Sequence, residues 1–172
     1  MADDLAGATT MTRTTELTGI ELTILDQLQR DARLSSAEIA PLLNISPSPT
    51  WRRIKRLEEL GVISGYQAIV NARRVGFGVE AFVTLSFSVH DERVPQVVAA
   101  AAATVDEIVA CYKVSGAGDY MMRVVARDME AYANLITNVI GVLPFVSKVR
   151  SAFVLNEVKP YSGLPIRKAH GW

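Results

Sequence analysis

Hydrophobic residues in the first third of the chain recur at helical spacing and predict three short helices. The first helix opens with the capping-box sequence Thr18-Gly19-Ile20-Glu21 and ends near residues 31–33. A second capping box over residues 35–38 opens a short helix, and a tight connection at Asn44-Ile45 leads to the third helix. The residues expected to face inward in the first two helices are Ile20, Ile24, Leu25, Leu28, Ile39, Leu42 and Leu43.

The third helix has an apolar face and a cationic face. Ser46 is its expected N-cap and Pro47 its first residue, because proline lacks only an amide hydrogen that would have no partner there. At about 100° per residue, the inward stripe consists of Thr50, Ile54, Leu57 and Gly61. Arg52 and Arg56 lie opposite this stripe, with Ser48 and Lys55 on one flank and Arg53 on the other. Three short helices with a turn before the third follow the helix-turn-helix plan, in which the third helix enters the major groove of DNA.

The rest of the chain alternates strands and helices. Residues 62–70 are expected to be extended, as a short hairpin or a linker strand, and residues 71–79 to mark a domain boundary. Strands are predicted at 81–89, 107–114, 119–126 and 146–158, and helices at 94–104 and 129–141. The order β-α-β-β-α-β is the ferredoxin-like plan, with two helices on one face of the sheet. The other face needs a cover, and the sheet of a second copy would supply one by forming a dimer.

The fold class is therefore α+β, with an N-terminal helix-turn-helix domain and a C-terminal ferredoxin-like domain. The expected organisation is a disordered arm at 1–16, a DNA-binding domain at 17–62, a linker at 63–79, a ferredoxin-like domain at 80–160 and a tail at 161–172.

Charge and composition narrow the classes of function. The 172 residues carry no net charge, and residues 1–75 hold nine basic and nine acidic side chains, so DNA affinity has to come from local clustering at 52–56. Asp3 and Asp4 argue against a signal peptide, and the alanine run 99–103 lies in an apolar stretch too short to span a bilayer, so we expect a cytoplasmic, nucleoid-associated protein and no membrane partner.

Catalytic and metal chemistry find no support in the sequence. One cysteine, Cys111, and two distant histidines give no credible spacing for a metal site or a Cys/His nucleophile pair, and we expect Cys111 to be a small buried hydrophobic residue. No P-loop or dinucleotide fingerprint is present. The chain is therefore not expected to be an enzyme or to need a cofactor.

In its order of motifs the chain resembles the feast/famine, or Lrp/AsnC, family of transcriptional regulators. The resemblance runs from about Leu17 to Pro165. In the first domain it rests on Leu25-Asp26, Leu34-Ser35, Glu38-Ile39-Ala40, Ser46-Pro47-Ser48, Arg53-Ile54-Lys55-Arg56-Leu57-Glu58 and Gly61-Val62-Ile63-Ser64-Gly65-Tyr66. In the second it rests on Val114-Ser115-Gly116, Asp119-Tyr120, Asp128 with Tyr132, Leu143-Pro144 with Val146, and Glu157-Val158-Lys159.

The resemblance implies a winged helix-turn-helix DNA reader followed by a ferredoxin-like domain that dimerises through its sheet. It also implies further assembly, into a tetramer or an octamer, and a free amino acid bound between dimers near a Gly-x-x-Asp-Tyr loop. The expected function is a transcriptional regulator that binds double-stranded DNA and responds to an amino acid. The alternative is an amino-acid-binding regulatory module that acts on a protein partner and carries a vestigial helix-turn-helix.

The candidate DNA contacts lie at the start and on the cationic face of the third helix. A charge run is often only a solvated helix face, but the position after a turn and a proline start favours DNA. Trp51, about 60° from the inward stripe, is expected to be partly buried against the first helix, with a contact to a thymine methyl or a sugar as the alternative. The candidates are Ser46, Ser48, Thr50, Trp51, Arg52, Arg53, Lys55 and Arg56.

The candidate effector loop lies between the second and third predicted strands. It could be only a glycine-bearing turn, but two glycines leave backbone amides open to a carboxylate, and Asp119 could accept hydrogen bonds from an ammonium group. The family commonly has acidic or aromatic residues where this chain has Ala117 and Gly118, which predicts an open pocket mouth. The candidates are Ser115, Gly116, Ala117, Gly118, Asp119, Tyr120 and, by resemblance on the last strand, Ser151.

Overall fold

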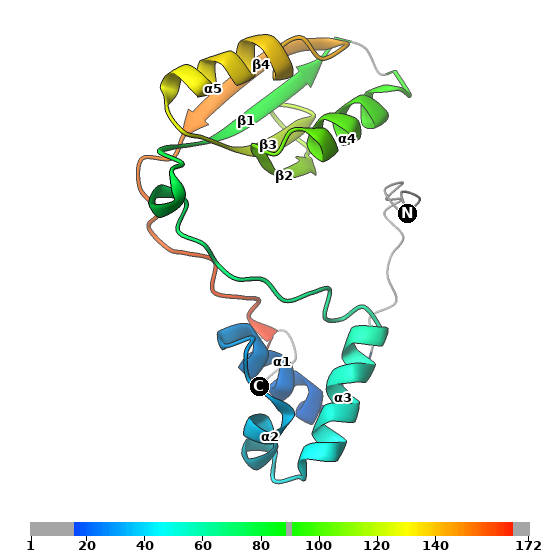
Figure 1. Ribbon diagram of the computed structural model, residues 1–172. Helices are drawn as coiled ribbons and strands as arrows, with labels where there is room; N and C mark the ends of the chain where they lie inside the picture. The colour runs from blue at the N-terminus through cyan, green and yellow to red at the C-terminus, as the bar shows by residue number, and fades with distance from the viewer. Residues whose placement is uncertain (1–15, 89–90, 167–172) are drawn as a thin grey trace. The chain divides into compact units, whose positions relative to one another are not determined.

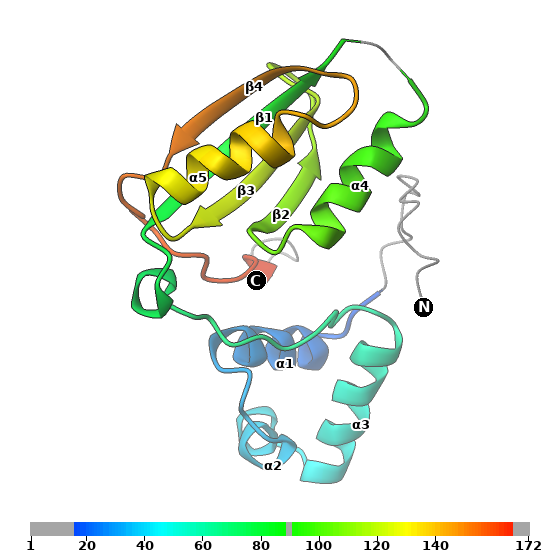
Figure 2. The same cartoon turned by 45° about the horizontal axis from the view of Figure 1, so that its top comes forward.

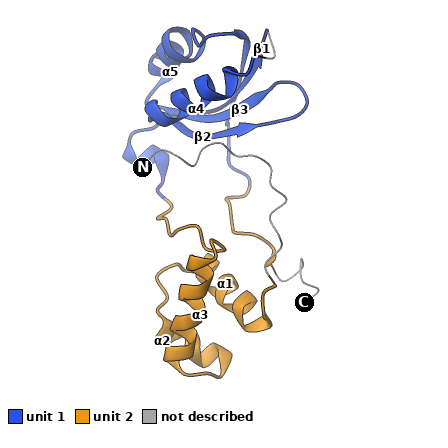
Figure 3. Ribbon diagram, turned by 90° about the vertical axis from the view of Figure 1, so that its right-hand side faces the viewer, with its two compact units in different colours: residues 1–6, 70–158 blue, residues 7–69, 159–172 orange. Residues whose placement is uncertain are grey.

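The computed structural model describes residues 16–88 and 91–166 and divides them between two compact units. Figure 1 shows the course of the chain, and Figure 3 colours the units separately. Of the described residues, one unit holds 70–88 and 91–158, and the other holds 16–69 together with 159–166. The predicted arm at 1–16 lies almost wholly outside the described residues, as does the second half of the predicted tail.

The first helix of the smaller unit begins and ends as the sequence predicts. Helix α1 runs over Gly19–Arg30, and both halves of the Thr18–Glu21 capping box are formed. Its inward face contributes Ile24, Leu25 and Leu28 to a core cluster, with Ile20 packed at the edge.

The second and third helices complete a three-helix arrangement. Helix α2 (Ser36–Ile39) continues into the 3₁₀ helix η1 (Ala40–Leu43), which ends at Asn44 with φ +52°. Asparagine tolerates this left-handed conformation, which turns the chain sharply into α3 (Pro47–Glu59). Leu42 does not face inward as expected: it is 57% exposed, because the tightened 3₁₀ turn rotates it away from the core that Leu43 reaches.

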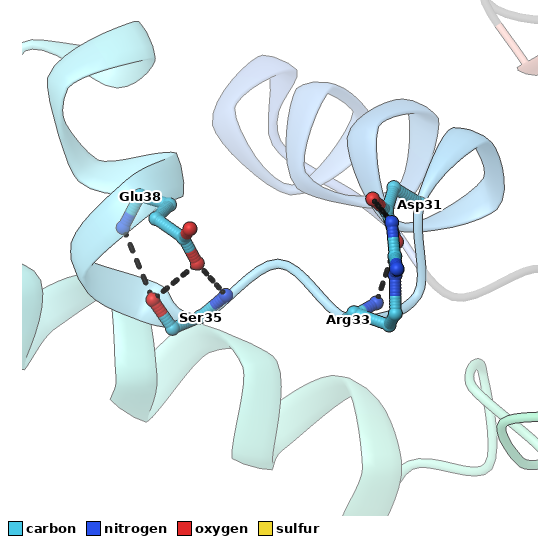
Figure 4. A network of polar contacts seen from close by, with 4 residues as sticks. All are labelled: Asp31, Arg33, Ser35 and Glu38. Atoms are coloured by element: carbon cyan, nitrogen blue, oxygen red, sulfur yellow. Dashed lines mark hydrogen bonds and ion pairs between the residues drawn. The ribbon is translucent and has the colours of Figure 1, made fainter.

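Local polar contacts hold the connection between α1 and α2 (Figure 4). The Asp31 carboxylate accepts hydrogen bonds from the Arg33 backbone and guanidinium at 2.8–3.0 Å. These bonds lower the pKa of Asp31 to about 2. Ser35 and Glu38 form the second predicted capping box, which starts α2 directly after this turn.

The segment after α3 contains no strand between Gly61 and Gly78, so the predicted linker strand or hairpin is wrong. Residues 64–71 belong to no helix or strand, and Ala72–Val75 form a 3₁₀ helix, η2, that Asn71 caps. This segment finds no ladder partner among the described residues, so its hydrophobic residues alone did not make it a strand.

The larger unit is built on a four-stranded antiparallel sheet. Its strands are β1 (Val79–Phe87), β2 (Ile108–Lys113), β3 (Tyr120–Ala126) and β4 (Val146–Phe153), in the spatial order β2-β3-β1-β4. This order confirms the ferredoxin-like plan. The last strand ends at Phe153, five residues before the predicted end, because the chain beyond Val154 finds no strand to pair with.

Two helical segments cover one face of this sheet, as Figure 2 shows. Helix α4 spans Val94–Thr104, and α5 (Met129–Leu135) continues into a π-helical turn, η3 (Ile136–Ile140). Alternate strand residues point toward these helices and form the core, including Val83, Leu85, Met122 and Val124. The remaining strand residues point to the opposite face, which none of the described helices of this unit covers.

Candidate functional site

The start of α3 presents some of the predicted DNA contacts to solvent and buries one of them. Ser46 is the N-cap residue, but its side chain makes no capping hydrogen bond, and both Ser46 and Ser48 are exposed. Thr50 is fully buried, and its hydroxyl donates to the Ser46 carbonyl at 3.1 Å. The prediction of Thr50 as a DNA contact is therefore corrected: it belongs to the inward stripe with Ile54 and Leu57.

The four cationic side chains of α3 differ in whether they have an acidic partner. Lys55 donates to the Glu58 carboxylate at 2.6 Å, and Arg56 forms an ion pair with Glu21 of α1. Arg52 and Arg53 form no ion pair with any residue that the structure describes. The cationic surface available to a phosphate is thus centred on Arg52 and Arg53, nearer the start of the helix than the sequence pattern indicates.

Glu21 links the third helix to the first through Arg56. Its side chain is only 1% exposed and accepts hydrogen bonds from the Thr18 backbone and hydroxyl, both at 2.9 Å. Burial raises the pKa of the Glu21 carboxyl, but the hydrogen bonds from Thr18 and Arg56 outweigh burial and hold the pKa below its usual value. A buried carboxylate therefore anchors the guanidinium of Arg56, whose primary partner is inside the protein.

Trp51 is exposed rather than packed on the first helix. Its side chain is 53% exposed and is absent from the core cluster of the three helices, so the expected partial burial against α1 is wrong. It stands beside Arg52 near the start of α3, where a large aromatic ring adds an apolar contact surface to a cationic one. Arg53, on the neighbouring flank, is half-buried.

The predicted effector loop is held rigidly against the first strand. The Asp119 amide donates to the Leu85 carbonyl at 2.8 Å, and an Asp119 carboxylate oxygen accepts from the Phe87 amide at 2.9 Å. The Val114 amide closes the loop by donating to the Asp119 carbonyl at 2.9 Å. Asp119 therefore keeps only one carboxylate oxygen, Oδ1, without a hydrogen bond within the described chain.

The two glycines of this loop serve different purposes. Gly116 has φ +120°, a conformation that side-chain-bearing residues rarely adopt. A Cβ at Gly118 would lie 2.3 Å from Thr84 Cγ2 and 3.0 Å from the Leu85 carbonyl oxygen. Gly118 thus permits close packing of the loop on β1, which is a more specific reason for glycine than the open pocket mouth that the sequence suggested.

Two predicted effector residues lie on the helix-covered face of the sheet, away from the loop's exposed surface. Tyr120 is buried, with its ring edge-on to Phe87 at 5.8 Å between centroids. Ser151 pairs in register with the core residue Val83, and the Tyr132 hydroxyl donates to Ser151 Oγ. The structure therefore brings Ser115–Asp119 together but does not place the Tyr120 and Ser151 side chains with them.

Arg150 is the loop neighbour that the sequence interpretation missed. It pairs with Thr84 on the uncovered face of the sheet, and its guanidinium donates to the Ala117 carbonyl at 3.3 Å. The alternation of side chains along β4 could have indicated Arg150, since adjacent strand residues point to opposite faces of the sheet.

Other chemistry is not favoured by the described residues. No group of three or more histidine, cysteine, aspartate or glutamate side chains there could hold a metal ion. Cys111 is a free, half-buried thiol at the edge of the sheet core, where burial raises its pKa. No helix within the described ranges is long and apolar enough to cross a membrane.

Both units match models of known protein families. Residues 17–64 match a winged helix-turn-helix DNA-binding model, and residues 80–164 match the Lrp/AsnC ligand binding domain. The chain is 34% identical over 159 residues to the Bkd operon transcriptional regulator of Pseudomonas aeruginosa, covering 88% of this chain and 99% of that one. It is also 34% identical over 152 residues to the leucine-responsive regulatory protein of Salmonella typhimurium, covering 88% and 93% of the two chains.

Solved structures agree with this match along nearly the whole chain. A transcriptional regulator of Neisseria meningitidis, solved as a complex with L-Met, has a TM-score of 0.84 at 28% identity, covering 90% of this chain and 99% of its own. An AsnC family regulator of Agrobacterium tumefaciens has a TM-score of 0.80 at 30% identity, covering 88% and 99%.

A DNA-reading helical unit joined to a ligand-binding sheet unit defines a transcriptional regulator rather than an enzyme. The chain belongs to the Lrp/AsnC family of these regulators, which confirms the resemblance noted in its motifs.

Proposed function

We propose that this regulator binds duplex DNA chiefly through Arg52, Arg53 and Trp51 at the exposed N-terminal half of α3. The observation that carries the proposal is the division of the four cations: Lys55 and Arg56 have acidic partners, whereas Arg52 and Arg53 have none among the described residues. Free guanidinium groups bind phosphates and guanine edges, and an exposed indole can contact a thymine methyl group. Ser46 and Ser48 lie at the same end of the helix, where their hydroxyls can donate to a backbone phosphate.

The effector proposed for the second unit is a free α-amino acid bound at the 115–119 loop. Asp119 Oδ1 can accept from the ammonium group, and the Arg150 guanidinium, next to the Ala117 carbonyl, can pair with the carboxylate. The L-Met complex of the Neisseria meningitidis regulator supports this class of ligand. Opposite charges on one loop surface match the two charged ends of an amino acid.

Self-association through the uncovered face of the sheet is proposed as well. Phe82, Met121 and Tyr112 lie on this face, and Tyr112 is 58% exposed. A second copy packed there would bury the apolar side chains and bring a second α3 to the DNA. We propose a dimer as the basic unit, with further assembly into a tetramer or octamer.

A salt titration tests the DNA function and separates it from an effector module that acts on a protein partner. The experiment measures fluorescence anisotropy of a labelled duplex, enriched from random sequence by the protein, across a range of salt concentrations. The affinity should fall with salt at a log–log slope of about −0.9 for each phosphate neutralised. Absence of salt-dependent binding, together with tight binding of an amino acid, would favour the protein-partner function instead.

A further inference from the structure

The C-terminal segment of the chain is part of the DNA-reading unit. After β4 and the chain to Val158, residues 159–166 return to the unit that contains α1, α2 and α3. This unit is therefore assembled from two stretches of sequence separated by the whole ferredoxin-like unit.

The Gln29 side chain of α1 binds the backbone of Leu164 in both directions. The Leu164 amide donates to Gln29 Oε1 at 2.6 Å, and Gln29 Nε2 donates to the Leu164 carbonyl at 3.2 Å. A primary amide that exchanges two hydrogen bonds with one residue's backbone imitates a bridge between two strands. Gln29 thus binds the backbone of Leu164 and makes no use of the Leu164 side chain.

Gly163 allows the segment to approach α1 this closely. Its φ is +90°, and a Cβ at this position would lie 2.8 Å from Gln29 Oε1 and 3.2 Å from Gln29 Cβ. Any other residue would need a strained backbone and would displace the amide that holds Leu164.

Ile166 joins the hydrophobic core of the unit. It is partly buried and packs against the cluster formed by Ile24, Leu25, Leu28, Ile39, Ile54 and Leu57. The same cluster includes two residues of α3, so Ile166 shares a core with the helix that carries Arg52 and Arg53.

We propose that residues 163–166 complete the DNA-reading unit and tie it to the ferredoxin-like unit by a second covalent connection. The first connection enters at residue 70, and the second leaves β4 at Phe153 and reaches Gln29 ten residues later, at Gly163. Because Arg150 lies on β4 beside the effector loop, a change in this strand has a direct route along the chain to α1. Two connections restrict the rotation of a DNA-binding unit more than one connection does, and thereby help to set the spacing of paired reading helices.

Hydrogen exchange measured by mass spectrometry tests the structural half of this proposal without reference to DNA. A chain that stops after Ser162 loses the segment, and its matched control stops after Ile166. Gln29→Ala removes only the two hydrogen bonds, and its control is Gln27→Ala, two residues earlier in α1, whose side chain makes no hydrogen bond within the described chain. The Ser162 stop and Gln29→Ala should raise amide exchange in α1 by about fivefold or more, and the controls should match the wild type.

Exchange in α1 that is unchanged in Gln29→Ala would overturn the proposal, even if the shorter chain failed to fold. The second part of the proposal, that this connection helps to position the unit on DNA, rests on the proposed DNA function. It predicts that Gln29→Ala weakens DNA affinity by about threefold or more. Raised exchange with wild-type DNA affinity would overturn the positioning role alone. A wild-type chain that did not bind DNA would instead contradict the proposed function and leave the exchange result intact.

Discussion

At the scale of single residues, partners distant in sequence decide which cations are available. A helical wheel places Arg52 and Arg56 on the same face of α3 and makes them equivalent. Arg56, however, meets a buried carboxylate 35 residues earlier in the chain, and Arg52 does not. Sequence periodicity describes the surface of one helix but contains no information about the neighbouring helix, so this distinction could be found only in the fold.

The same limit applies to the candidate effector site, because a step of one residue along a strand changes the face of the sheet to which the side chain points. The sequence supplied the loop itself, with Asp119 and both glycines. It pointed to Ser151 on β4, but the register pairs Ser151 with Val83 of the core and Arg150 with Thr84 of the open face. A resemblance that marks a strand does not fix which of two adjacent side chains lies on the open face.

Arg150→Ala should abolish or strongly weaken stabilisation by the amino-acid effector, because it removes the cation proposed to pair with the ligand carboxylate. The measurement is a thermal-shift screen of the twenty amino acids against the wild type, followed by titration of the best ligand against the variant. Loss of one charge-assisted pair should weaken binding by about tenfold or more.

Lys148→Ala is the matched control, since Lys148 lies one pair further along the same face of β4 and makes no hydrogen bond to the loop within the described chain. Equal ligand affinity in Arg150→Ala and the wild type would place the effector elsewhere.

At the scale of elements, local signals predicted the helices well and the strand ends less well. Both capping boxes formed where their residues indicated, because a cap is a contact between neighbours in sequence. Strands at 62–70 and beyond Phe153 were expected but are absent, because a strand requires a partner that a local pattern cannot guarantee. The turn into α3 was predicted from its position, and Asn44 supplies the left-handed residue that it needs.

The ion pair between α1 and α3 gives a prediction at this scale. Glu21→Gln removes the negative charge but keeps the shape, so it should lower the free energy of unfolding at pH 7 by about 2 kcal/mol. The folded pKa of Glu21 lies below 4.5, its usual value, so its stabilisation is present above this value and is lost as the pH falls through the folded pKa. Denaturant unfolding of wild type and variant should therefore converge in acid.

Glu59→Gln is the control: it removes the charge of an exposed carboxylate on the same helix as Arg56. It should change the free energy of unfolding little, at neutral pH or in acid. A wild-type advantage over Glu21→Gln that stayed constant from neutral pH into strong acid would contradict the role of the charge.

At the scale of the whole molecule, the order of elements along the sequence was enough to predict two units and their fold classes. The change from helical spacing to alternating strands marks the boundary, and the β-α-β-β-α-β order allows few topologies. The return of residues 163–166 to the unit of α1, α2 and α3 was not predictable, because the four residues glycine, leucine, proline and isoleucine are too few to show a periodicity. Its place depends on the Gln29 amide, which has no distinctive signal in a helix.

The two units also divide the function. The cationic end of α3 is proposed to contact DNA, and the sheet unit to supply the effector loop and the face through which a second copy binds. A single α3 covers only a few base pairs, so two copies would be required for a specific site.

DNA binding by Arg52→Ala/Arg53→Ala, measured by fluorescence anisotropy beside Lys55→Ala, tests the proposed function most directly. The double variant should weaken binding by at least about tenfold and reduce the salt slope by about 0.9 for each phosphate that is no longer neutralised. Lys55→Ala, whose wild-type ammonium already has an acidic partner, should change both much less. Sedimentation should give the double variant the same mass as the wild type, since α3 lies outside the sheet unit. Wild-type affinity and salt slope in the double variant would contradict the central claim that these two arginines bind DNA.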